Sequence, residues 1–255
     1  VNAWGLNGNF GQYTADARSV DIFVHDRKDL TPIFSVGDRG TSGASQISSP
    51  ATAKNVISIG ASTTGAPGTP AAGEVVNFSS LGPSLDGRVK PDLVAPGVAI
   101  CSGLAEEAKN PAGPSCLTGA HADGNSYYMS LSGTSQATAI ASGVAGLTRE
   151  FIREQVGVSS PSSSLVKAAM INGARDLDTP DIPNAAEGWG EVDLERTVLP
   201  MDGATPLDTF VDDKKVLSPG FGLLYSFSID PSHGFDMTLA WTDEAGSAIA
   251  PQSQA

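Results

Sequence analysis

Residues 133–143, with the sequence GTSQATAIASG, constrain the fold of this chain more than any other stretch. The residues just before them, YYMSL at 127–131, are rich in β-forming side chains. Beyond Ser135, apolar and small residues recur at helical spacing, namely Ala137, Ile140, Ala141, Val144, Ala145, Leu147, Thr148, Phe151 and Ile152. The pattern predicts a strand followed by a buried helix, with Ser135 in the first turn of that helix.

Two interpretations of Ser135 are open from this pattern alone. Free N–H groups and the positive end of the helix dipole gather at a helix N-terminus, so negative charge that develops nearby is stabilised there. The hydroxyl of Ser135 is therefore placed as the nucleophile of an acyl-transfer site would be. Ser and Thr are also preferred helix caps, and the Gly-Thr-Ser triplet by itself favours that structural role.

Further motifs follow one another along the chain. They are NAWG at 2–5, SVGDRG at 35–40, FSSLGP at 78–83, DGRVKPD at 86–92, APG at 95–97 and GWGEV at 188–192. Together with GTSQATA at 133–139, these motifs resemble, in order, the signatures of the subtilisin-like serine proteases, or subtilases. The nucleophile segment of that family reads Gly-Thr-Ser-Met-Ala-x-Pro, from which Gln136 and Ala139 depart.

The resemblance implies an α/β fold, a partial subtilisin-like doubly wound parallel sheet followed by the opening strands of a β-sandwich. Residues 1–200 are expected to form a partial catalytic domain, which includes helices near 17–28 and 164–173. Residues 201–255 are expected to begin a C-terminal β domain that is truncated. Within them, the runs at 223–229 and 237–242 alternate apolar and polar side chains, which predicts a pair of strands.

The resemblance also assigns the site. Ser135 is the expected nucleophile of a serine endopeptidase that hydrolyses peptide bonds through an acyl-enzyme. Two segments are expected to form opposite walls of the primary specificity pocket and to bind an extended peptide as edge strands: Ala3, Trp4 and Gly5, and Ser35, Val36 and Gly37. The expected partner is therefore a protein or peptide substrate.

Asp38 stands where subtilases usually carry an Asn that donates to the oxyanion of the tetrahedral intermediate. An ionised carboxylate only accepts hydrogen bonds, whereas a protonated one can donate. The acid-acting sedolisins, which share the fold, use Asp at this place, so an acid-acting sedolisin-like peptidase is one alternative. Asp38 as a turn residue in a Gly-rich loop is another.

A serine hydroxyl needs a base within hydrogen-bond reach and a third group that orients the base. The Asp-Thr/Ser-Gly and His-Gly-Thr-His segments that supply them in subtilases do not occur in these residues, and the only histidines are His25, His121 and His233. We therefore expect a fragment of a protease that is inactive by itself. A pseudoprotease that keeps a peptide-binding cleft is the alternative.

Composition narrows the partners and the compartment. A net charge of −13 argues against nucleic acid and anionic membranes as partners. By resemblance the protein is secreted or extracytoplasmic, which favours a disulfide between Cys101 and Cys116, although two buried thiols are the alternative. No cofactor is identified. Calcium is implied only by the family, and no residues are assigned to it.

Overall fold

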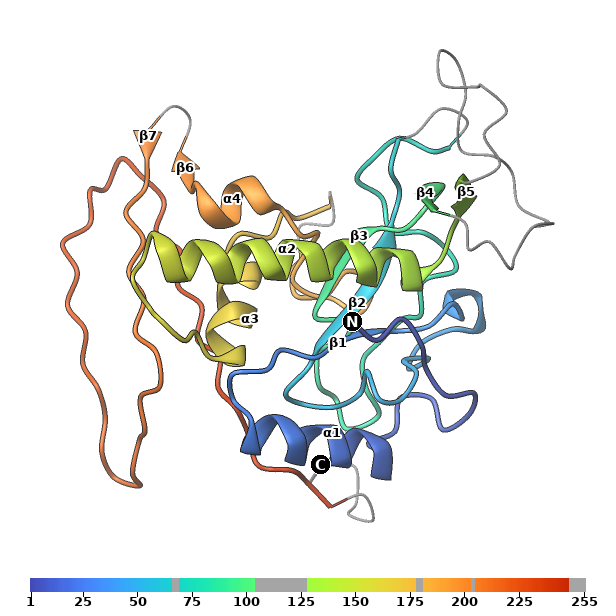
Figure 1. Cartoon of the computed structure of the whole chain (residues 1–255), viewed down its shortest axis with the longest axis horizontal. Helices are drawn as coiled ribbons and strands as arrows, with labels where there is room; N and C mark the ends of the chain where they lie inside the picture. Colours follow the sequence, from blue (N-terminus) through green and yellow to red (C-terminus); the bar gives the residue numbers. More distant parts are fainter. Residues whose placement is uncertain (66–68, 104–127, 178–180, 203–204, 248–255) are drawn as a thin grey trace.

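A three-stranded parallel sheet lies at the centre of the computed structural model, which describes residues 1–65, 69–103, 128–177, 181–202 and 205–247 (Figure 1). The strands are β1 (Ile33–Ser35), β2 (Ile57–Ser62) and β3 (Leu93–Pro96), and their order in the sheet is β1-β2-β3. The residues of β1 and β2 are all buried. Such continuous burial is typical of parallel strands that are covered on both faces.

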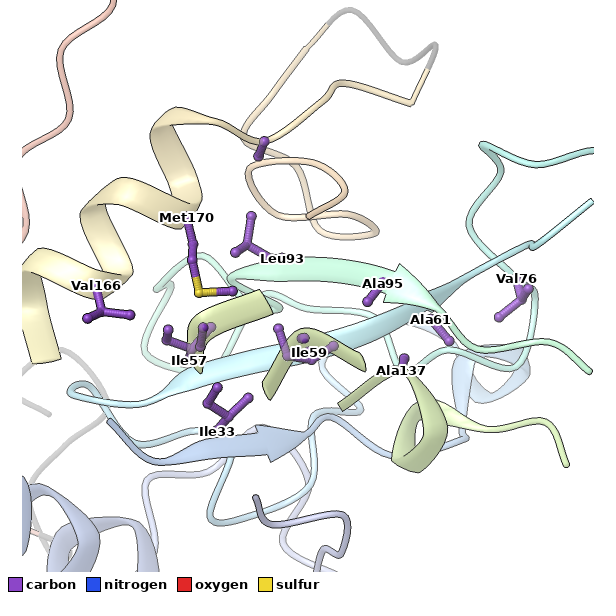
Figure 2. Close-up of a cluster of buried hydrophobic side chains, with 13 residues drawn as sticks. Ile33, Ile57, Ile59, Ala61, Val76, Leu93, Ala95, Ala137, Val166 and Met170 are labelled. Atoms are coloured by element: carbon purple, nitrogen blue, oxygen red, sulfur yellow. The ribbon is translucent and has the colours of Figure 1, made fainter. Parts of the chain in front are cut away.

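Helices α2 (Thr134–Glu154) and α3 (Ser163–Asn172) cover one face of this sheet. Ala137, Ala141 and Ala145 of α2 pack on β2 and β3, and their short side chains let the helix lie close to the strands. Figure 2 shows the core that results, in which Ile57 of β2 lies next to Met170 of α3 and Ile59 lies farther along the same strand.

Helix α1 (Ala15–Asp26) lies against the other face, where Ala17 packs in a second core with Phe34 and Val36. Thr14 caps α1, since its hydroxyl accepts a hydrogen bond from Ala17 N at 3.3 Å. The fold therefore has three layers, helix on sheet on helix, and the predicted α/β class is confirmed.

Shorter elements complete the described structure. Strands β4 (Ile100–Gly103) and β5 (Tyr128–Leu131) form an antiparallel pair that leads directly into α2. The remaining elements are η1 (Gly40–Ser42), α4 (Leu194–Val198), β6 (Met201–Asp202) and β7 (Thr205–Pro206). None of the helices within the described ranges combines the length and the hydropathy of a membrane-spanning segment.

A buried charge cluster stabilises the amino end of the sheet. Asp92, just before β3, accepts hydrogen bonds from the backbone N–H and the hydroxyl of Ser58 at 2.8 and 2.7 Å. The same carboxylate pairs with Lys90 at 2.8 Å and with Lys167 of α3 at 2.7 Å. Burial alone would raise the pKa of Asp92, but the two ammonium groups outweigh it and hold the pKa well below its usual range. Burial also lowers the pKa of Lys90 to about 8.

Two sequence predictions differ from the structure. Phe23 lies at helical spacing with Ala17, Val20 and Val24, which predicts a buried stripe, yet its side chain is 48% exposed because Ala17 and Val24 are the apolar residues of α1 that are fully buried. The predicted strands at 223–229 and 237–242 are absent, and their apolar side chains are largely exposed. Alternation gives a strand only where a neighbouring strand pairs with the backbone, and neither run has such a partner among the described residues.

The C-terminal segment 207–247, which we call the strap, instead forms a long extended loop that projects beside the α3 end of the body and then returns to run along α1 (orange to red in Figure 1). At one end Asp213 accepts hydrogen bonds from the N–H and the hydroxyl of Ser162, which caps α3. At the other end Asp243 pairs with Lys54 at 2.9 Å, and Gly246 N donates to Tyr13 Oη at 3.1 Å. The strap therefore joins the α3 side of the molecule to the α1 side.

Candidate active site

The N-terminus of α2 lies at the carboxyl edge of the sheet, where open α/β folds bind ligands. Gly133 N donates to Gly97 O at 2.9 Å, directly after β3. A Cβ on Gly97 would lie 2.7 Å from Ala61 Cβ and 2.9 Å from Gly133 O, so only glycine permits this close approach. The contact fixes the start of α2, and with it Ser135, beside the ends of β2 and β3.

Ser135 is the second residue of α2, so it lies in the first turn of the helix, as the sequence pattern predicted. Its hydroxyl donates to the backbone carbonyl of Ala3 at 2.9 Å. A carbonyl oxygen orients the hydroxyl but does not take up its proton near neutral pH, because an amide is a very weak base. The N-terminal segment thus positions Ser135 without activating it.

Asp38 contacts the same helix start from a loop after β1. Its Oδ1 accepts a hydrogen bond from Thr134 N at 2.8 Å, and Gly37 N donates to Thr134 Oγ1 at 3.2 Å. The N-cap residue, Gly133, has no side chain that could accept a hydrogen bond from the first turn of α2. The N–H of Thr134 therefore bonds to an acceptor from another loop. The alternative in which Gly-Thr-Ser caps its own helix is therefore wrong.

Gly37 gives the loop its shape. Its φ is +96°, a backbone conformation that residues with a Cβ rarely adopt, and an added Cβ would collide with Ser48 Oγ. The left-handed turn at Gly37 directs Asp38 to the start of α2. Glycine is required here for both conformation and space.

A pocket of about 320 Å³ opens at this place. Its lining consists of Trp4, Gly5, Asn7, Ser35, Gly37, Asp38, Arg39, Ser48, Thr134 and Ser135. The structure therefore brings together six of the predicted site residues in one pocket. Ala3 contributes its carbonyl to Ser135, whereas Val36 is buried in the core on the α1 face and does not line the pocket.

The sequence missed four of the lining residues. Arg39 and Thr134 lie inside recognised motifs, so the sequence could have indicated that they belong to the pocket lining. Asn7 and Ser48 had none, because they reach the pocket from loops that no motif marks.

The second pocket wall continues from the end of β1, and its backbone groups are bonded within the protein. Val36 N donates to Ile59 O at 3.1 Å, and Val36 O accepts from Ser48 N at 2.8 Å. Gly37 O accepts from Ser80 N at 2.9 Å. Because these groups are already paired within the protein, the prediction that residues 35–37 bind a peptide by strand addition is wrong. The N-terminal segment at 2–5 lies outside β1, with Asn2 bridged to Phe34.

No histidine lines the pocket in the described part of the chain. His25 lies in α1, 3.8 Å from Asp26, and His233 lies in the C-terminal strap. His121 is outside the described residues, as is Cys116, so the pairing of Cys116 with Cys101 of β4 stays a prediction. Among the described residues, no three acidic, His or Cys side chains are grouped to hold a metal ion.

Comparisons with known proteins agree with one another. The model of the family described as "Subtilase family" matches residues 1–190. A Dictyostelium discoideum protein named serine protease/ABC transporter B family protein tagA is 32% identical over 191 residues, which cover 68% of this chain and 10% of the relative. Serine protease AprX of Bacillus subtilis is 34% identical over 161 residues, or 62% of this chain and 34% of AprX.

Solved structures show the same fold. The prenylagaramide maturation protease PagA superposes with a TM-score of 0.55 at 21% identity, covering 77% of this chain and 58% of PagA. The patellamide maturation protease PatA gives a TM-score of 0.53 at 21% identity, with 77% and 60% covered. The chain spans about a tenth of the length of the tagA relative.

Proposed function

Because this chain belongs to the subtilase family of serine proteases, we propose that its site carries the nucleophile and specificity pocket of a serine endopeptidase, with Ser135 as the nucleophile. The observation that supports this most is the position of the Ser135 hydroxyl. It lies at the start of α2, in the lining of a pocket shared with Trp4 and Asp38. The substrate is a protein or peptide.

In the proposed reaction, Ser135 Oγ attacks the carbonyl carbon of the scissile peptide bond while a base takes the hydroxyl proton. The proton passes to the leaving amine, the C–N bond breaks and an acyl-enzyme remains, which water then hydrolyses. The positive end of α2 stabilises the oxyanion. Asp38 Oδ1 already accepts a hydrogen bond from Thr134 N, which leaves Asp38 Oδ2 as the oxygen that can face the oxyanion.

The part of the chain that the structure describes supplies no base at the site, so we propose that the isolated chain is an inactive fragment whose catalytic Asp and His come from other residues. Loss of these groups leaves only the residual rate that binding and oxyanion stabilisation give. Residues 1–200 then form the partial catalytic domain and residues 201–255 begin a further domain. The proposal also includes export of the protein from the cytoplasm and a disulfide between Cys101 and Cys116.

A pseudoprotease that binds peptides without cleaving them is the second candidate. It is favoured by the bond from Ser135 to the Ala3 carbonyl, and by Asp38 in place of a neutral donor. An acid-acting, sedolisin-like reaction is a third candidate that rests on Asp38 alone. The test of this third candidate compares the pH–rate profiles of the active protein and its Asp38→Asn variant. If a protonated Asp38 donates to the oxyanion, the substitution must change the alkaline limb of the profile.

The decisive experiment combines sequencing and active-site labelling. The coding DNA upstream of the Val1 codon is read first, and the full gene product and the 255-residue chain are then treated with a fluorophosphonate. We expect labelling of the full product at Ser135, its loss in Ser135→Ala, and no labelling of the 255-residue chain. A full product that contains the Asp and His segments yet labels equally well in Ser135→Ala would overturn the proposal. A full product that binds peptides but never labels is a pseudoprotease.

A further inference from the structure

Among the described residues that line the pocket, Arg39 is the only cationic one. Its guanidinium lies over the ring of Phe10, 4.5 Å from the ring centroid, and its backbone N–H donates to Ser80 Oγ at 3.1 Å. Stacking on an aromatic face restrains a long side chain that would otherwise sample many rotamers. The charge of Arg39 is thus held beside the pocket.

The charge of Arg39 is not neutralised by a carboxylate. It forms no ion pair with any acidic residue in the described part of the chain, and Asp38 is the only acidic residue of the lining. Asp38 Oδ1 is engaged by Thr134 N at the positive end of α2, which offsets its charge. Arg39 therefore brings a positive charge without a carboxylate partner to the lining of the pocket.

The rest of the lining is suited to a polar guest. Ser35, Ser48 and Thr134 carry hydroxyls and Asn7 carries an amide, whereas Trp4 is the only large apolar side chain. An apolar side chain in this pocket would displace water from these polar groups and would offer no hydrogen bonds in its place. A carboxylate accepts from hydroxyls, from an amide and from a guanidinium.

We propose that this pocket selects peptides whose inserted side chain bears a carboxylate, and that Arg39 is the residue that determines this specificity. The inference rests on the proposed function, because it names the substrate class of the same site. A guanidinium that forms a charge-assisted hydrogen bond favours glutamate over glutamine by about tenfold.

Peptide binding to the 255-residue chain tests the inference without catalysis. Fluorescently labelled octapeptides that are identical except for Glu, Gln or Lys at one central position are titrated with the wild type, Arg39→Gln and Arg39→Glu, and anisotropy is measured. Arg27→Gln is the matched control, since Arg27 is an exposed arginine paired with Asp29 outside the pocket lining. Circular dichroism checks that each variant folds.

We expect the wild type and Arg27→Gln to bind the Glu peptide about tenfold more tightly than the Gln peptide, and the Lys peptide most weakly. Arg39→Gln should abolish this preference and Arg39→Glu should reverse it toward Lys. Equal binding of all three peptides by the wild type overturns the role of Arg39 and leaves the peptide site standing. A Glu preference that survives in Arg39→Glu also overturns it. Binding of none of the peptides overturns this inference, whereas the proposed function is tested separately by the fluorophosphonate labelling of the full gene product.

Discussion

At the residue scale, the start of α2 depends on groups that come from far along the chain. Asp38 contacts Thr134 across 96 positions, and Ser135 contacts Ala3 across 132 positions. Each contact uses one backbone group, so the identity of the side chain matters at Asp38 but not at Ala3. This explains why a motif can name the nucleophile and still leave its surroundings undetermined.

The conformation of Gly37 gives a first prediction. Gly37→Ala should lower the free energy of unfolding by about 2–4 kcal/mol, since it combines an unfavourable positive φ with a collision at Ser48 Oγ. Gly157→Ala is the matched control, with φ +86° and nothing within 4 Å of the added Cβ. It should cost only about 1–2 kcal/mol. Urea denaturation measures both, and equal losses would show that crowding at Gly37 is unimportant.

The charge cluster at Asp92 gives a second prediction, for Lys167→Met. The folded pKa of Asp92 lies below its unfolded value, so its stabilising effect is present above about pH 4 and is lost as the pH falls. Removing Lys167 raises the folded pKa, and we expect a loss of about 2 kcal/mol at pH 7. The difference from the wild type should narrow only as the pH falls through the raised folded pKa of Asp92 in the variant, because both proteins share the same unfolded pKa.

Chemical denaturation across this pH range measures the effect. Lys215→Met is the control, because Lys215 pairs with Asp212 at 3.2 Å but is largely exposed. It should change stability by less than about 1 kcal/mol at any pH. A loss in Lys167→Met that does not shrink as the pH falls through the acid range in which Asp92 of the variant takes up its proton would mean that the pairing with Asp92 is not its cause.

At the scale of the elements, the close packing of α2 on the sheet follows from its small residues. The sequence predicted this helix and α3 well, because apolar periodicity reports burial directly. The predicted strands after residue 200 failed because alternation reports strand propensity but not a pairing partner. The pocket walls were predicted from motifs, whereas Asn7 and Ser48 were missed because their place depends on loop paths that no local pattern encodes.

Helix α2 gives a third prediction. Ala141 is fully buried against the sheet, so Ala141→Leu should destabilise the protein by about 1–3 kcal/mol through overpacking. Ala139→Leu is the matched control on the exposed side of the same helix and should change stability by less than about 0.5 kcal/mol. Thermal and urea unfolding compare the two variants, and a neutral Ala141→Leu would contradict the close packing.

At the scale of the whole molecule, the strap at 207–247 joins the two helical layers through polar contacts at its ends. Its middle carries exposed apolar side chains, among them Leu224, Met237 and Leu239. The segment is thus secured at Asp213 and Asp243 and contributes little to the core. Its stability is therefore local rather than global.

The strap gives a fourth prediction. Asp243→Ala removes the partner of Lys54 and should speed proteolysis within residues 216–241, while the unfolding of the body stays within about 1 kcal/mol of wild type. Asp230→Ala is the control, because the Asp230 carboxylate accepts hydrogen bonds from Ser232, two positions away, and the substitution leaves the pairing of Asp243 with Lys54 in place. Limited proteolysis with mass spectrometry measures the cleavage. Equal rates in the two variants would show that Asp243 does not secure the strap.

The strap also determines the order in which the molecule can be built on the ribosome. Its bonds from Asn55 to Asp243 and from Tyr13 to Gly246 close loops of 188 and 233 positions. These loops cannot close until nearly all of these residues have left the exit tunnel, whereas the sheet and α2 need only the first 154 residues. Until then, the polar groups of Tyr13 and Asn55 that later receive the strap stay hydrated in the nascent chain.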